Sequence, residues 1–167
     1  VMGNRVGEIM SLMWRDIDFD KGEICVRSTY CRKEKRIKDY PKGGKQYRLT
    51  LQSEVVEKLR LAFQNRASDY VCPGPSGQMM SYHSYYVILR RYCMEAGVTI
   101  VATHGLRHST SAIWKAAGAT DGDIQKLFNH SSASVTERYI HGTDERLTHV
   151  ARKMRLITHV DHQRRRA

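Results

Sequence analysis

The chain has 167 residues, with 28 Lys or Arg against 17 Asp or Glu, which gives a formal net charge of +11. This length suits one globular domain, the 41% of hydrophobic residues excludes general disorder, and no apolar run approaches the ~20 residues of a membrane helix. The excess of basic side chains indicates a polyanionic partner such as nucleic acid, because Lys and Arg neutralise phosphates. No signal-peptide pattern opens the chain, so we expect a cytoplasmic protein without membrane contact.

The first half of the chain predicts one helix followed by a small antiparallel sheet. Apolar residues on helical spacing predict a helix over residues 3–16, and Gly22 marks a turn after it. Three strands are then predicted: over residues 23–30, through Ile37 and Tyr40, and through Tyr47, Leu49 and Leu51. The sequence Pro-Lys-Gly-Gly at residues 41–44 is a strong turn signal, so the last two strands form a basic hairpin.

The second half predicts helices that end at glycines or begin at capping residues. They run from Ser53 to Phe63, over 84–96 before Gly97, over 104–117 before Gly118, and from Asp121 to Phe128. A capping box at 134–137 predicts a short helix that carries Tyr139. An apolar stripe follows at Leu147, Val150, Ala151 and Met154. The sequence therefore predicts a single α+β domain, mostly helical, with a small three-stranded antiparallel sheet.

Neither the cysteines nor the histidines predict a metal site. The four cysteines form no C-x-x-C pair, match no zinc-ribbon spacing and are expected to be reduced packing residues: Cys25, Cys31, Cys72 and Cys93. His104 and His108 have i, i+4 spacing, but no Glu follows the first histidine as the H-E-x-x-H pattern requires.

Three islands carry the residue types that phosphodiester transfer without a metal needs. Arginines would meet the charge of a phosphorane, a nucleophile would attack phosphorus, and a general acid would protonate the leaving oxygen. The islands are G-N-R-V-G-E within 3–18, T-H-G-L-R-H at 103–108, and N-H-S-S with T-E-R-Y-I-H within 129–141. In the second island, His104 and Arg107 share one helical face at i, i+3.

In this order, with a lysine-bearing hairpin between the first two, the islands resemble the catalytic domain of the tyrosine recombinase (phage integrase) family. The resemblance covers nearly the whole chain and implies a role for each matched residue. Arg5 and Arg107 bind the scissile phosphate, His104 assists proton transfer, His130 contacts the phosphate, and Tyr139 is the nucleophile that forms a 3′-phosphotyrosyl bond. The resemblance implies no metal, cofactor or ATP, because the arginines supply the charge.

The resemblance also assigns supporting residues. Glu8 matches an acidic residue that supports the site, although at i, i+3 from Arg5 it also fits an ordinary surface ion pair. Lys42 is the favoured match to the hairpin lysine that protonates the leaving 5′-oxygen, and Lys45 is its rival, because short hairpins slide in register. The basic side chains expected to bind DNA are Arg32, Lys33, Lys35, Arg36, Lys38 and Lys45.

Residues 1–158 are expected to form the catalytic domain, and residues 159–167 a flexible basic tail. Family members carry one or more helices and a core-binding domain before the first arginine, so we expect a fragment or a shortened reading frame. Asn4 and Asn129 also depart from the family pattern, which usually has a hydrophobic residue and a glycine at these positions.

The resemblance implies a site-specific recombinase, an integrase of a phage or mobile element in a bacterial cytoplasm. It would act on double-stranded DNA within a tetramer of protomers. The apolar stripe at 147–154 fits either the core or exchange of the C-terminal helix with a neighbouring protomer. Two alternatives stay open: a type IB topoisomerase, which shares the chemistry as a monomer, and a DNA-binding remnant that no longer catalyses.

Overall fold

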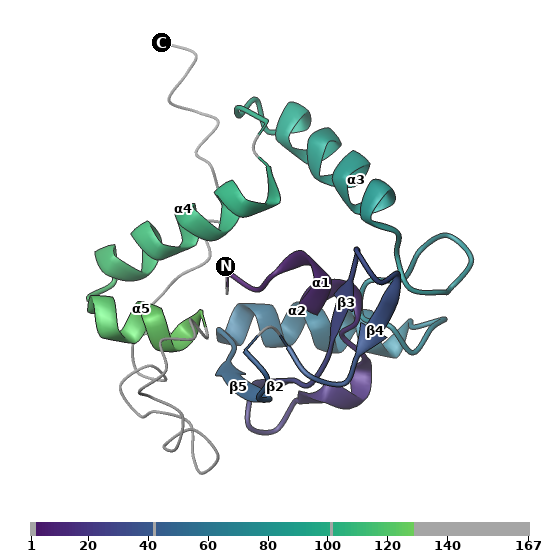
Figure 1. The fold of residues 1–167 in the computed structure, drawn as a ribbon, viewed down its shortest axis with the longest axis horizontal. Helices are drawn as coiled ribbons and strands as arrows, with labels where there is room; N and C mark the ends of the chain where they lie inside the picture. The colour runs from purple at the N-terminus through teal and green to yellow at the C-terminus, as the bar shows by residue number, and fades with distance from the viewer. Residues whose placement is uncertain (1–2, 42, 101, 129–167) are drawn as a thin grey trace.

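The computed structural model describes residues 3–41, 43–100 and 102–128, except for the side chain of His104 (Figure 1). The helices in these ranges are α1 (Val6–Met10), α2 (Ser53–Gln64), α3 (Tyr82–Glu95), α4 (Thr103–Ala116) and α5 (Asp121–Leu127). The strands are β1 (Ile17–Asp18), β2 (Glu23–Val26), β3 (Thr29–Cys31), β4 (Arg36–Lys38) and β5 (Tyr47–Thr50). The arrangement is α+β, as predicted.

The helix predicted over residues 3–16 is wrong in its length, because α1 ends at Met10. Met13 is extended, and its neighbours Leu12 and Trp14 make hydrogen bonds to a segment that is remote in sequence. The Trp14 N–H donates to the Asp69 carbonyl at 3.0 Å, and the Val71 N–H donates to the Leu12 carbonyl at 3.0 Å. These tertiary hydrogen bonds replace the helical ones. A single 3-10 turn (Trp14–Asp16) then leads into β1.

The predicted strand over residues 23–30 is two strands that belong to different sheets. β2 is the centre of an antiparallel sheet in the order β1-β2-β5, whereas β3 pairs with β4 in a separate two-stranded sheet. The break falls at Arg27 and Ser28. Arg27 forms an ion pair with Asp16 at 3.0 Å, and the Ser28 hydroxyl donates to the Ser11 carbonyl at 3.5 Å. The third strand of the sheet is therefore β1. The strand predicted through Ile37 and Tyr40 is instead β4, which pairs with β3 and ends at Lys38, before Tyr40.

The other helices confirm their predictions to within two residues, because their end signals are local. Gly97 and Gly118, which follow α3 and α4, have φ of +64° and +97°, values that favour glycine. At the start of α5, the Thr120 N–H donates to a carboxylate oxygen of Asp123 at 2.8 Å. Ser53 is not a cap, because it is already the first residue of α2.

The hydrophobic core joins the three-stranded sheet to α4 and α5, which lie side by side in Figure 1. Trp114 of α4 is fully buried, and Ile124 and Leu127 of α5 pack with it against side chains of β2 and β5. All four cysteines are free, and Cys25 and Cys93 are buried. Of the helices in the described ranges, none combines the length and apolar character needed to cross a bilayer.

Candidate active site

Arg5 stands directly before α1, and a close approach of backbones fixes this end of the helix. A Cβ atom at Gly7 would lie 2.5 Å from the carbonyl oxygen of Tyr30 and 2.7 Å from the hydroxyl of Thr29. Only glycine therefore lets α1 rest on β3 at this distance. The contact holds the start of α1, and Arg5 directly before it, against β3.

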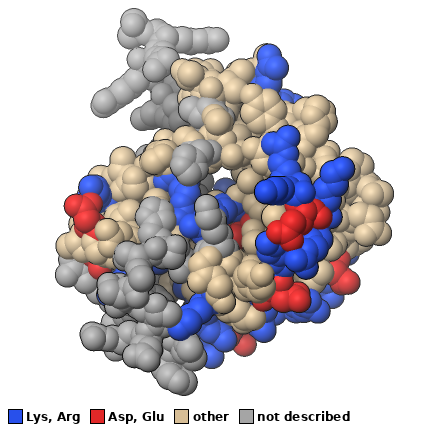
Figure 2. Space-filling view, in the orientation of Figure 1, with Lys and Arg blue, Asp and Glu red and all other residues tan. Residues whose placement is uncertain are grey.

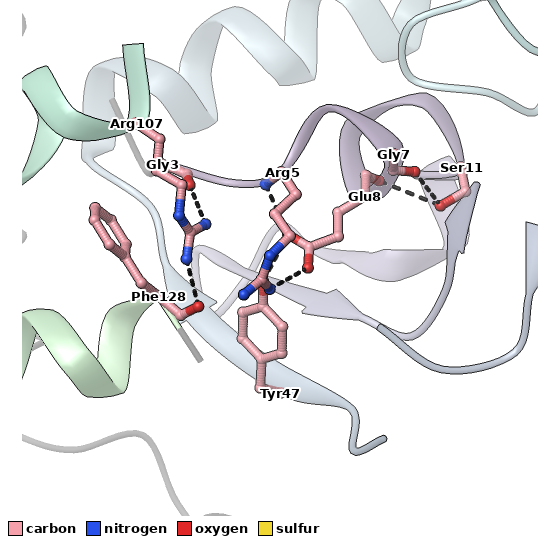
Figure 3. A network of polar contacts seen from close by, with 8 residues as sticks. All are labelled: Gly3, Arg5, Gly7, Glu8, Ser11, Tyr47, Arg107 and Phe128. Atoms are coloured by element: carbon pink, nitrogen blue, oxygen red, sulfur yellow. Dashed lines mark hydrogen bonds and ion pairs between the residues drawn. The ribbon is translucent and has the colours of Figure 1, made fainter. Parts of the chain in front are cut away.

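Glu8 is the centre of a buried polar network (Figure 3). Its Oε2 atom accepts from the main-chain N–H of Arg5 at 2.8 Å and from the Tyr47 hydroxyl at 2.9 Å. Its Oε1 atom accepts from the Arg5 guanidinium at 3.0 Å. Glu8 is only 2% exposed, so the interpretation of this pair as an ordinary surface ion pair is wrong.

Tyr47 is the first residue of β5, and its phenol stays neutral. Burial and the nearby negative charge of Glu8 raise its pKa well above the ordinary value, while the charges of Arg5 and Arg107 act in the opposite direction. Because the phenol keeps its proton, its hydroxyl can donate a hydrogen bond to the Glu8 carboxylate. The network therefore joins β5 to α1 through one hydrogen bond between residues that are 39 positions apart.

Arg107 faces inward because of its register on α4. It lies three residues before Thr110 and seven before Trp114, and all three side chains are buried on one helical stripe. Its Nη1 donates to the Gly3 carbonyl at 2.5 Å, and its Nη2 donates to the Phe128 carbonyl at 2.5 Å. Burial, followed by the positive charge of Arg5, lowers its pKa, and Tyr47 and Glu8 act in the opposite direction.

The two carbonyls that Arg107 binds belong to segments next to other candidate residues. Gly3 lies two residues before Arg5, and Phe128 lies at the C-terminal end of α5, two residues before His130. Gly3 has φ +68°, and a Cβ there would lie 2.4 Å from the ring of Phe128. The guanidinium of Arg107 thus draws the start of the chain and the end of α5 together.

The structure brings Arg5 and Arg107 to one polar cluster with Glu8 and Tyr47. Their side chains extend into the same region in Figure 3, and each arginine acts electrostatically on Tyr47. The main chain of His104 lies in the first turn of α4, one turn before Arg107. Lys42, His130 and Tyr139 lie outside the described residues, as do the helix predicted at 134–137 and the apolar stripe at 147–154.

Sequence patterns missed Gly3, Tyr47 and Phe128 as parts of this cluster. Tyr47 and Phe128 were recognised only as apolar members of a strand and a helix. Their polar partners are remote in the chain, as the 104 positions between Arg107 and Gly3 illustrate. No local spacing could have indicated such contacts.

The basic side chains around the β3–β4 hairpin divide into two groups. Arg36 pairs with Glu34 at 2.8 Å, and Lys38 pairs with the same carboxylate. Lys38, with Arg36 second, lowers the pKa of Glu34 by hydrogen bonding to it. Of the others, the Arg32 guanidinium lies 4.7 Å from the ring centre of Tyr82, and Lys33, Lys35 and Lys45 are exposed. Figure 2 shows basic side chains gathered on this face with acidic ones among them.

Comparison with known proteins agrees with the resemblance of the three islands. Residues 1–146 match the family described as the phage integrase family. The chain belongs to the phage integrase family. It is 32% identical over 145 residues to the tyrosine recombinase XerC of Xanthomonas campestris pv. campestris (strain B100). The matched region covers 83% of the chain and 40% of that protein. It is also 32% identical over 160 residues to the tyrosine recombinase XerA of Thermococcus kodakarensis, which covers 93% of the chain and 52% of that protein.

The chain thus spans about half the length, or less, of these relatives in the phage integrase family. Solved structures show the same fold. The integrase of the Tn1549 transposon, in complex with a circular intermediate DNA, superposes with a TM-score of 0.67 at 19% identity, over 86% of the chain and 52% of the integrase. The integrase from the mycobacterium phage Brujita gives a TM-score of 0.66 at 24% identity, over 91% of the chain and 47% of that integrase. The α+β fold predicted for the chain is therefore that of phage integrases.

Proposed function

We propose that residues 1–158 are the catalytic domain of a site-specific recombinase that breaks and rejoins double-stranded DNA. The observation that carries this proposal is the approach of Arg5 and Arg107 to one cluster in a chain of the phage integrase family. The relatives' names support it, since they are called tyrosine recombinases, and the Tn1549 integrase was solved with DNA. A basic chain of net charge +11 suits the polyanion.

The arginines supply positive charge where a phosphorane gathers negative charge. Arg107 uses one N–H of each terminal nitrogen for the Gly3 and Phe128 carbonyls. Within the described part of the chain, the other three of its five N–H groups are open to a phosphate. Glu8 binds the Nη1 atom of Arg5 at 3.0 Å, which fixes the direction in which the guanidinium is presented. Fixed donors of this kind act at no reorganisation cost during the reaction.

The covalent step follows from the roles that the family pattern assigns. The Tyr139 oxygen attacks phosphorus, a bond forms between that oxygen and the 3′-phosphate, and the bond to the 5′-oxygen breaks. His104 assists transfer of the phenol proton, His130 contacts the phosphate, and Lys42, with Lys45 as its rival, protonates the leaving 5′-oxygen. A 5′-hydroxyl of a second strand then reverses the step, so resealing needs no ATP.

The proposed setting is that of an integrase of a phage or other mobile element. Strand exchange needs two DNA sites and several protomers, so we propose a tetramer on DNA. The apolar stripe at 147–154 fits either the core or exchange of the C-terminal helix between these protomers. The exposed basic side chains around the β3–β4 hairpin would contact phosphates.

The decisive experiment is covalent capture of the chain on DNA. The chain is incubated with a pool of nicked duplexes of randomised sequence around the nick, and denaturing electrophoresis reveals protein that is covalently joined to DNA. The proposal expects an adduct that Tyr139→Phe abolishes while duplex binding persists. An adduct that survives Tyr139→Phe, or no adduct with any duplex, overturns the proposal. Relaxation of a supercoiled plasmid that lacks every captured sequence would instead indicate a topoisomerase.

A further inference from the structure

The hydroxyl of Tyr47 has one partner in the described structure and a buried position. Tyr47 is 7% exposed, and its oxygen lies 2.9 Å from Glu8 Oε2. A buried phenol hydroxyl costs free energy unless it makes a hydrogen bond, and Glu8 supplies an ionised acceptor. Burial of the Tyr47 ring therefore favours the hydrogen bond between its hydroxyl and Glu8.

The hydrogen bonds at Glu8 divide its two oxygens between separate tasks. Oε2 accepts from the Tyr47 hydroxyl and from the Arg5 main chain, whereas Oε1 accepts only from the Arg5 guanidinium among the contacts described. Without the Tyr47 hydrogen bond, Oε2 keeps only its contact with the Arg5 main chain among the contacts described. The carboxylate is then less restrained about its last bond, and the direction in which it holds the guanidinium is less defined. Tyr47 thus constrains the angle at which Arg5 is presented.

The position of Tyr47 in the chain gives this contact a second consequence. Tyr47 begins β5, pairs with Val26 of the central strand, and stands two residues after Lys45 and five after Lys42. The turn that carries both candidate general acids therefore leads straight into the residue that holds Glu8.

We infer that Tyr47 is a positioning residue of the phosphoryl-transfer site, which acts through Glu8 to orient the Arg5 guanidinium. This inference rests on the proposed function. Tyr47 does not touch the reacting phosphate; its hydroxyl fixes the carboxylate, and the carboxylate fixes the arginine. The neutral state of the buried phenol agrees with this role, because only a protonated hydroxyl donates.

The test is Tyr47→Phe, which removes one oxygen and keeps the ring. On a nicked duplex captured by the wild-type chain, the single-turnover rate of adduct formation at saturating protein should fall about tenfold, the effect of losing one hydrogen bond to a charged group. The dissociation constant for the same duplex should change less than about twofold. Tyr92→Phe, an exposed tyrosine of α3, is the matched control and should leave both quantities unchanged.

A double-mutant cycle shows whether Tyr47 acts through Glu8. In a Glu8→Gln background, Tyr47→Phe should add less than about twofold to the loss of rate, because the carboxylate it orients is already gone. A rate for Tyr47→Phe equal to that of the wild type, a matching loss of duplex binding, or full additivity with Glu8→Gln would each overturn the inference.

A spectroscopic measurement separates failure of this inference from failure of the proposed function. If the wild-type chain forms no adduct, the proposed function fails, and Arg5 can still be observed through its side-chain N–H signal in a nitrogen-15 NMR spectrum. Tyr47→Phe should shift or broaden the Arg5 signal and leave the signal of exposed Arg91 unchanged. An unchanged Arg5 signal in Tyr47→Phe overturns the inference whatever the activity.

Discussion

The guanidinium of Arg107 lies 4.1 Å from the ring centre of Phe128 and also donates a hydrogen bond to the carbonyl of the same residue. One side chain thus holds both the ring and the main chain at the end of α5. Because the other end of the guanidinium binds the Gly3 carbonyl, Arg107 has a structural role besides its proposed contact with phosphate. Substitutions here should therefore change stability as well as chemistry.

Arg107→Lys should destabilise the chain although it keeps the charge. Lysine lacks the planar fork whose two terminal nitrogens each donate to one carbonyl and that lies over the Phe128 ring, so a buried acceptor loses its donor. We expect the free energy of unfolding, measured by urea denaturation, to fall by about 2 kcal/mol. Arg91→Lys on the exposed face of α3 should change it by less than about 0.5 kcal/mol. Equal effects of the two substitutions would contradict the clamp assigned to Arg107.

Gly3→Ala should be more harmful than alanine at another glycine of similar backbone conformation. Gly3 and Gly97 have φ of +68° and +64°, so both substitutions cost about 1 kcal/mol of backbone strain. At Gly3 the new Cβ would also lie 2.4 Å from the Phe128 ring, whereas nothing lies within 4 Å at Gly97. Overpacking should add roughly 1–3 kcal/mol at Gly3 alone.

Thermal unfolding of the two glycine variants measures this difference. The melting temperature of Gly3→Ala should fall further than that of Gly97→Ala. If Gly97→Ala proves the more damaging change, the packing of Gly3 against Phe128 does not contribute as the structure indicates.

Tyr47 should make the stability of the chain depend on alkaline pH. Burial and the charge of Glu8 raise its pKa above the ordinary 10.0, so the folded state keeps a proton that the unfolded state releases. The stabilisation is complete below about pH 10 and falls above it by about 1.4 kcal/mol per pH unit. Tyr47→Phe should remove this part of the slope when urea unfolding is compared between about pH 9 and pH 11.5.

Other titrating groups contribute to the alkaline slope equally in both proteins, so the difference between wild type and variant isolates Tyr47. Tyr92→Phe, at an exposed position, should retain the full slope of the wild type. A slope in Tyr47→Phe that matches the wild type would mean that the phenol ionises normally in the folded chain.

Lys33→Gln should weaken DNA binding in a salt-dependent way. Lys33 is exposed in the loop between β3 and β4, whereas Arg36 and Lys38 share Glu34. Loss of one phosphate contact should reduce the slope of log K against log salt concentration by about 0.9. Titration of a labelled duplex at several salt concentrations measures it, with Lys58→Gln on the exposed face of α2 as control. An unchanged slope would remove Lys33 from the DNA-binding surface.

Local features made much of this fold predictable. Helices α2 to α5 follow from apolar periodicity, and the ends of α3 and α4 follow from Gly97 and Gly118, because these signals act within one helical turn. The family resemblance was carried by three short islands, and comparison with known proteins confirms it. The candidate roles of Arg5 and Arg107 were likewise available from their motifs.

Only the tertiary structure decided the early end of α1, the division of residues 23–30 between two sheets, and the burial of Glu8. In each case a partner far along the chain supplied the deciding contact: the carbonyl of Asp69, the side chain of Asp16, or the hydroxyl of Tyr47. Sequence periodicity reports which face of an element is apolar, but it carries no information on which remote donor will satisfy a given acceptor. That choice is made when the elements pack, because a buried polar group must find its partner within about 3 Å.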